Sequence, residues 1–270
     1  MTLLEAIILG IVQGATEFLP ISSSAHVIMI PSLLNLPEPG LEAISIAHLG
    51  TLLAVLIYFR RDLWAIAWAW LGSLRVRRPL VSSDSRLGWY ILLGSLPAVV
   101  AGYLLLAPIG RLFGQPMTAA WLLYATAALL VASEQLYRPR LALEGMRPAD
   151  ALLIGIAQAF ALLPGISRSG STIAAGLGLG LKREAAGRFS FLLGVPAIAG
   201  AGLLALLDLL QSAGPASQWR LLLLTFALAF GVGYACIAFL LAWLRRRRLY
   251  LFAVYCVLIA SLYLINSPAR

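Results

Sequence analysis

Long apolar stretches separated by short polar breaks run along the chain. A helix rises about 1.5 Å per residue and the bilayer core is about 30 Å thick, so one span needs about 20 apolar residues. The pattern therefore predicts spanning helices over the longest stretches, near residues 43–59, 87–107, 117–136, 186–210, 219–244 and 249–265.

Several apolar segments are shorter and lie on either side of a proline. Segment 21–34 follows Pro20, and segments 150–163 and 169–181 flank Pro164. A stretch of 14 residues reaches only about 21 Å as a helix, which is too short to span. We therefore expect re-entrant hairpins, the first of which pairs segment 21–34 with segment 2–18.

Composition supports a membrane protein. Of the 270 residues, 61% are hydrophobic and 11% charged, whereas soluble domains contain about 45–50% apolar and about 25% charged residues. This composition excludes an ordinary soluble enzyme and leaves no room for a separate soluble domain. The apolar N-terminus carries Glu5 and lacks the positive start of a signal peptide, so we interpret it as mature protein.

The net charge of +9 is informative through its location. Residues 1–59 contain no Lys or Arg, whereas sixteen of the 20 basic residues fall within 60–86, 138–147, 182–188 and 245–248. By the positive-inside rule these segments, including the predicted loop 60–86, are cytoplasmic. Both termini and the first hairpin are then outside, and the charge indicates orientation rather than nucleic-acid binding.

The two hairpins resemble each other in sequence. Gly10 and Gln13 in the first correspond to Gly155 and Gln158 in the second, at an offset of 145 residues. Because the hairpins enter from opposite sides, the duplication predicts inverted-topology repeats, which place a site near the midplane. We therefore predict one all-α, polytopic membrane domain, 1–270, of about ten helical segments, with repeats at about 1–136 and 150–265 and a basic cytoplasmic linker at 137–149.

The first hairpin tip concentrates polar side chains, namely Gln13, Glu17, Ser22, Ser23, Ser24 and His26. Gln13 and Glu17 are four residues apart and share a helix face. A serine-rich helix start after Pro20 exposes backbone N–H groups, which suit an anion. His26 follows Ser23 by three residues, so we expect the imidazole to approach a serine hydroxyl. An ionisable group inside a membrane indicates a functional site.

The second tip has a similar start with a cation. Arg168 lies between Ser167 and Ser169, with Thr172 one turn later. A guanidinium and free N–H groups at a helix start would together hold phosphate oxygens. A structural pairing of Arg168 with Glu17 is compatible with that role.

Other polar residues suggest simpler roles. His48 lies near the start of a span and is interpreted as a structural histidine. Glu38 and Glu42 are expected as solvated charges in an outer loop. Cys236 and Cys256 lie in apolar runs without metal-ligand spacing, so we expect them to pack in the core.

The polar segments resemble those of the undecaprenyl-diphosphate phosphatase family, the bacitracin-resistance membrane phosphatases. The segment QGATEFLPISSSAH at 13–26 is similar to the family's (E/Q)xxxE motif and the Ser and His that follow it. The segment PGISRSGST at 164–172 is similar to its PGxSRSxxT motif, and the likeness continues through 183–196. The resemblance implies hydrolysis of undecaprenyl diphosphate to the monophosphate carrier of cell-wall synthesis.

The resemblance also implies residue roles. Glu17 would contact a metal or the diphosphate, Ser23 would be the nucleophile, His26 the acid/base and Arg168 the phosphate clamp. Gln13 is neutral where many members carry Glu. The resemblance further implies a divalent cation, Mg²⁺ or Ca²⁺, a bacterial inner-membrane location and a site open to the periplasm. A second copy of the chain is a candidate partner, and the remaining diphosphate ligands would be Ser22, Ser24, Ser167, Ser169 and Thr172.

Two alternatives remain at this point. Water activated by the site could attack the phosphate directly in place of Ser23. A polyprenyl-phosphate transporter or flippase would also use inverted repeats and an anion site, but it would need no nucleophile. A paired-histidine acid phosphatase is disfavoured because Ala174 stands where its histidine would be.

Overall fold

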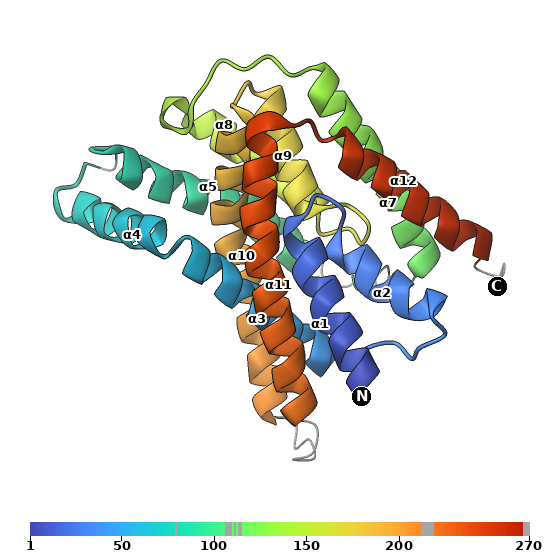
Figure 1. The fold of residues 1–270 in the computed structure, drawn as a ribbon. Coiled ribbons are helices and arrows are strands. Elements are labelled where there is room, and N and C mark those ends of the chain that lie inside the picture. Colours follow the sequence, from blue (N-terminus) through green and yellow to red (C-terminus); the bar gives the residue numbers. More distant parts are fainter. Residues whose placement is uncertain (79, 106–109, 111, 113–114, 212–218, 267–270) are drawn as a thin grey trace.

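The computed structural model describes residues 1–270 except 79, 106–109, 111, 113–114, 212–218 and 267–270. Its described residues form eleven α-helices, one 3₁₀ turn and no strand beyond an isolated Leu141–Leu181 bridge (Figure 1). The helices are α1 (Leu3–Phe18), α2 (Ser23–Leu33), α3 (Leu41–Tyr58), α4 (Arg60–Arg75), α5 (Ser83–Leu104), α7 (Pro116–Gln135), α8 (Pro148–Phe160), α9 (Arg168–Gly178), α10 (Arg183–Gln211), α11 (Trp219–Arg246) and α12 (Tyr250–Asn266). The predicted all-α architecture is confirmed.

Four helices in the described part of the chain, α3, α5, α7 and α11, are long and apolar enough to cross a membrane. Many of their large apolar side chains face outward; Val99 and Leu223, for example, are more than 60% exposed. Such exposure suits contact with lipid rather than water. The chain is thus a polytopic integral membrane protein.

The short helices pair as the sequence predicts. Helix α1 is followed within five residues by α2, and α8 within eight residues by α9. In Figure 1 the α1–α2 hairpin rises from the end where the N-terminus lies, and the α8–α9 hairpin comes from the opposite end. Their tips meet in the middle of the molecule, which is the arrangement expected of inverted hairpins.

The packing of the hairpins supports an internal duplication. Helix α1 packs chiefly against α11, and α8 packs against α5. Gly10 allows the first approach, because a Cβ there would lie 2.8 Å from the Thr225 carbonyl oxygen. Gly155 allows the second, since a Cβ there would clash with the backbone of Gly94. The two glycines at the predicted offset therefore both allow close packing of a hairpin helix against a neighbouring helix. The repeat boundaries themselves stay a prediction.

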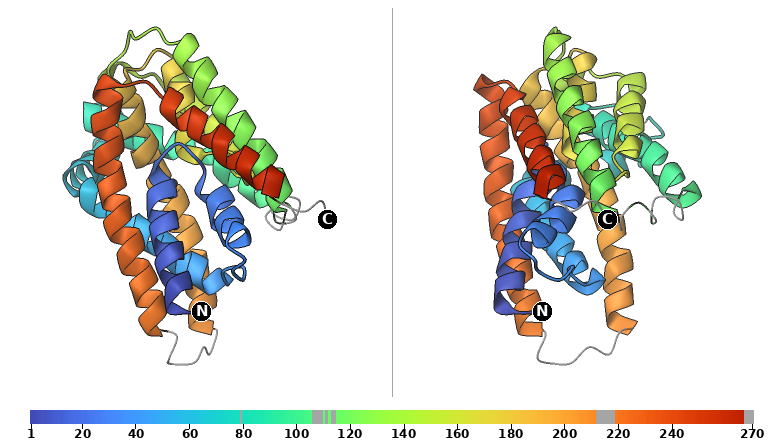
Figure 2. Two further views of the ribbon diagram at one scale, coloured as in Figure 1. Left: turned by 45° about the vertical axis from the view of Figure 1, so that its right-hand side comes forward. Right: turned by 90° about the vertical axis from the view of Figure 1, so that its right-hand side faces the viewer.

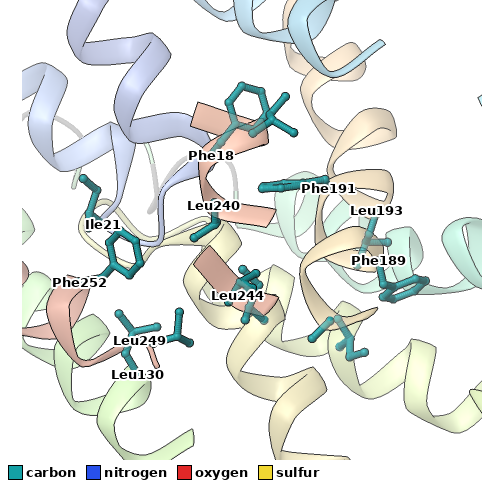
Figure 3. Packing of buried hydrophobic residues seen from close by; sticks show 14 of the residues in the cluster. Phe18, Ile21, Leu130, Phe189, Phe191, Leu193, Leu240, Leu244, Leu249 and Phe252 are labelled. Atoms are coloured by element: carbon teal, nitrogen blue, oxygen red, sulfur yellow. The ribbon is translucent and has the colours of Figure 1, made fainter. Parts of the chain in front are cut away.

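Helices α7 and α12 form a further pair, side by side in both views of Figure 2. Figure 3 shows part of the buried core from close by, where it packs against the first hairpin tip. Phe18 at the end of α1 meets Phe191 of α10 edge to face, with ring centroids 5.6 Å apart. Figure 3 also shows Ile21 of the first tip beside Phe252 of α12. The core thus supports the first tip.

One part of the predicted organisation is wrong. Residues 60–86, expected as a loop, consist mostly of α4 and the start of α5. Helix α4 packs along α5, with Ile66 and Ser73 buried and Trp64 and Trp68 exposed. The segment is too polar for a span but its apolar side is sufficient to pack on a neighbouring helix.

Candidate active site

The first tip brings a carboxylate and a serine hydroxyl into contact. The hydroxyl of Ser23, the first residue of α2, donates to Glu17 Oε2 at 2.7 Å. Gln13, one turn before Glu17 on α1, donates from Nε2 to the same oxygen at 3.1 Å. This carboxylate is buried and held from two sides.

The backbone of this tip is strained. Ser22, the N-cap of α2, has φ 71° and ψ 101° and provides no side-chain cap. A non-glycine residue in such a conformation costs about 1–3 kcal/mol and occurs mainly at functional sites. The Ser22 side chain therefore accepts no hydrogen bond from the first N–H groups of α2. These N–H groups are suited to bind an anion.

The second tip is built conventionally. Ser167, the N-cap of α9, has φ −72°, and its hydroxyl accepts from Gly170 N at 3.0 Å. Arg168 begins the helix, and its Nη1 donates to the Ser190 carbonyl at 3.3 Å. Gly194 leaves the space that the guanidinium occupies, because a Cβ at position 194 would overlap Arg168.

Three contacts join the tips. Arg168 Nη2 donates to Glu17 Oε1 at 2.8 Å. The hydroxyl of Ser169 donates to the Leu19 carbonyl at 3.0 Å, and Gly165 N donates to Ser24 Oγ at 3.4 Å. The ion pair anticipated between Glu17 and Arg168 is therefore present, although the two residues are 151 positions apart.

A cavity of about 380 Å³ opens at this junction. Its lining combines polar groups of both tips with apolar side chains that include Val27, Ile28, Ile44 and Leu162. Its volume is in the range of small-molecule sites. An amphiphile with an anionic head fits such a mixed polar and apolar lining.

The predicted site residues divide into two sets. Those that line the cavity are Gln13, Glu17, Ser22, Ser23, Ser24, Ser167 and Arg168. His26, Ser169 and Thr172 lie behind it, each about 1% exposed. The hydroxyl of Thr172 donates to the Arg168 carbonyl at 2.8 Å, so it supports the start of α9. Ser169 likewise ties the tips together.

The expected approach of His26 to a serine hydroxyl is wrong. Its Nδ1 lies 2.8 Å from the Ser22 carbonyl and its Nε2 lies 3.0 Å from the Tyr255 hydroxyl. On α2 the imidazole points back toward the N-cap carbonyl, while the Ser23 side chain turns to Glu17. The catalytic roles themselves stay predictions.

Two residues of the site were not predicted. His48 lines the cavity, with Nε2 3.9 Å from Glu17 Oε2 and Nδ1 2.9 Å from the Ile44 carbonyl. An imidazole inside an apolar span was a signal for function that the structural interpretation passed over. Gly194 gave no such signal, because its role depends on a contact with another helix.

Oxygen donors for a cation are also present. Gln13 Oε1 is buried without a hydrogen-bond partner among the described residues, beside the Glu17 carboxylate. Within the same residues no group of three His, Cys, Asp or Glu side chains could hold a metal. An ion here would therefore need further ligands from phosphate or water, as is usual for Mg²⁺.

Comparison with known proteins indicates the same family as the sequence motifs. The family described as bacitracin resistance protein BacA matches residues 6–262. The chain belongs to this family. It is 48% identical to an undecaprenyl-diphosphatase of Thermomicrobium roseum over 100% of both chains. It is 44% identical to one of Alteromonas mediterranea, covering 94% of this chain and 95% of the relative, and 43% identical to one of Micrococcus luteus, covering 97% and 95%.

Proposed function

We propose that this protein hydrolyses undecaprenyl diphosphate to undecaprenyl phosphate and inorganic phosphate, which recycles the lipid carrier of peptidoglycan synthesis and gives bacitracin resistance. The observation that carries the proposal is the meeting of Ser23, Glu17 and Arg168 in one cavity that is also lined by apolar side chains. The names of the relatives support the same substrate.

The polar groups that line the cavity suit a diphosphate. The Arg168 guanidinium and the first N–H groups of α2 supply donors to phosphate oxygens. Phosphoryl transfer depends mainly on positioning and on neutralising charge, which these groups provide without rearrangement. Prenyl carbons next to the head would lie against Val27, Ile44 and Leu162.

Ser23 is the proposed nucleophile, and Glu17 is its proton acceptor. As the Ser23 oxygen bonds to the terminal phosphorus, its proton passes to Glu17 Oε2, 2.7 Å away. The bond between that phosphorus and the bridging oxygen breaks, and undecaprenyl phosphate leaves. Water then hydrolyses the phosphoserine and releases inorganic phosphate. Direct attack by water is the competing scheme.

A divalent cation fits the site as a part of this proposal. Gln13 Oε1 and Glu17 would hold it, together with phosphate oxygens. When bound, Mg²⁺ or Ca²⁺ supplies positive charge to the phosphate. The chain's own residues remain responsible for aligning Ser23 and accepting its proton.

We further propose that the protein lies in the inner membrane with its site open to the periplasm and both termini on that side. The clustering of basic residues supports this orientation. Cysteines placed singly near Leu36 and near Arg78 should then label from opposite sides of intact cells. Labelling of both from one side would contradict the arrangement. The homodimer stays a prediction, which mass measurement in detergent tests.

The function is tested by phosphate release from undecaprenyl diphosphate by the purified protein in detergent. We expect release by the wild-type protein and a loss of about 10³-fold or more in Ser23→Ala. Ser45→Ala, which removes a hydroxyl that donates to the Leu41 carbonyl on α3, is the matched control and should keep the wild-type rate. Lipid transport without phosphate release would instead favour the flippase.

A further inference from the structure

The buried side chain of His26 and the partly exposed side chain of Tyr255, which is 39% exposed, form a pair beside the strained start of α2. His26 is 1% exposed and does not line the cavity, and neither does Tyr255 of α12. Their rings are parallel within 10°, and the ring nitrogen and hydroxyl that face each other are 3.0 Å apart. The imidazole is thus separated from the reacting atoms and bound on both sides.

The partners determine which nitrogen carries the proton. A carbonyl oxygen can only accept, so His26 Nδ1–H donates to the Ser22 carbonyl at 2.8 Å. In the neutral ring, the lone pair of Nε2 can then accept a hydrogen bond from the Tyr255 hydroxyl. Neither nitrogen is free to take a proton from Ser23, whose own hydroxyl is donated to Glu17.

The carbonyl that His26 holds belongs to the strained residue. Ser22 has φ 71° and, unlike Ser167 on the other tip, makes no side-chain cap of its own. A strained backbone persists only where surrounding contacts hold it. Helix α12 contributes a further contact to this tip, since Cys256 Sγ lies 4.0 Å from the Pro20 carbonyl.

We propose that His26 and Tyr255 are positioning residues that hold Ser22 in its strained conformation and thereby aim Ser23 at Glu17. This inference rests on the proposed phosphatase function and replaces the acid/base role expected for His26. Both residues act through the backbone, so they should influence kcat far more than KM.

The test compares variants that keep or remove the Nδ1–H donor. His26→Asn places an amide N–H near the position of Nδ1, whereas His26→Gln places its amide near Nε2. We expect kcat to fall about 100-fold in His26→Ala and His26→Gln, and less than about fivefold in His26→Asn, with KM within about twofold throughout. An acid/base residue would not be rescued by Asn, which does not titrate.

Tyr255→Phe provides an independent arm. Loss of its hydroxyl leaves His26 Nε2 without a donor, so we expect kcat to fall about three- to tenfold. Tyr263→Phe is the matched control, because this residue of α12 also bonds α2, through Ser32 at 3.3 Å, but lies away from the tip. It should retain the wild-type kcat.

The outcomes are distinguishable. The thermal transition in detergent shows whether the His26→Asn variant is folded. If it is folded yet as inactive as His26→Ala, the positioning role is overturned. An unaffected Tyr255→Phe would overturn the part assigned to Tyr255. If the wild-type protein released no phosphate, the proposed function would fail first, and this inference with it.

Discussion

The two hairpin tips have similar sequences and the same type of helix start, but they are held differently. Ser167 caps α9 with its own hydroxyl and an ordinary backbone. Ser22 stands at the corresponding start of α2 with φ 71° and no side-chain cap. The residue after each N-cap also differs, since Ser23 begins α2 and Arg168 begins α9.

This difference indicates a division of labour between the repeats. The conventional tip presents a fixed cation, which needs only a stable helix start and room for the guanidinium. The strained tip presents the hydroxyl and carboxylate that would carry the chemistry, and backbone strain typically concentrates at such sites. Neither tip alone completes the cavity, because the Glu17–Arg168 pair joins them.

Apart from loss of the proposed nucleophile, the largest effect should come from removing the cation of the second tip. We expect Arg168→Ala to lower phosphate release about 10³-fold, because charge neutralisation dominates phosphoryl transfer. Arg188→Ala is the matched control, since Arg188 also pairs with a carboxylate at 2.8 Å, Asp62, but outside the cavity. Equal losses in both variants would mean that Arg168 acts through stability alone.

The carboxylate of the first tip should follow closely. Glu17→Gln keeps the shape of the side chain but removes the proton acceptor for Ser23 and the charge facing Arg168. We expect the rate of phosphate release to fall about 10²- to 10³-fold. A rate near that of the wild-type protein would exclude Glu17 as the base.

The space that Gly194 leaves for the Arg168 guanidinium can be tested without changing the charge of Arg168. A methyl group at Gly194 would overlap Arg168, so Gly194→Ala should misplace the cation and lower kcat/KM about 10- to 100-fold. Gly200→Ala on the same helix would place its Cβ more than 4 Å from any atom of the described residues outside its own helix, and it serves as the control. If the two variants behave alike, the space at position 194 is unimportant.

The smallest effect concerns the neutral amide of the first tip. Gln13→Glu adds a negative charge beside Glu17 and should lower the Mg²⁺ concentration for half-maximal phosphate release about tenfold. Gln135→Glu at the exposed end of α7 adds the same charge far from the cavity. An unchanged Mg²⁺ requirement in Gln13→Glu would argue against a cation held at this position.

Much of this site could be predicted from the sequence. The apolar segments indicated the helices, and the short segments around Pro20 and Pro164 indicated the hairpins. Local spacing could not show where side chains point once a helix starts with a strained residue. His26 was therefore expected beside a serine hydroxyl, whereas it contacts a backbone carbonyl and Tyr255, 229 residues away.

The unpredicted members of the site depend on packing between distant helices. His48 reaches the cavity because α3 packs against α1, and Gly194 matters only because α10 packs against α9. Neither contact leaves a periodic signal in the chain. Helix α4 is amphipathic, so its sequence pattern could have indicated a helix where we expected a loop; its packing partner α5 could not be predicted in this way.

Trapping the covalent intermediate would show directly whether the strained tip supplies the nucleophile. The wild-type protein is given undecaprenyl diphosphate that is labelled in its terminal phosphate. The reaction is quenched in acid during turnover, and the peptides of the protein are analysed by mass spectrometry. We expect labelled phosphate on Ser23 and none on any peptide of Ser23→Ala. Label on another residue, or phosphate release with no labelled peptide at any time, would contradict this role of Ser23.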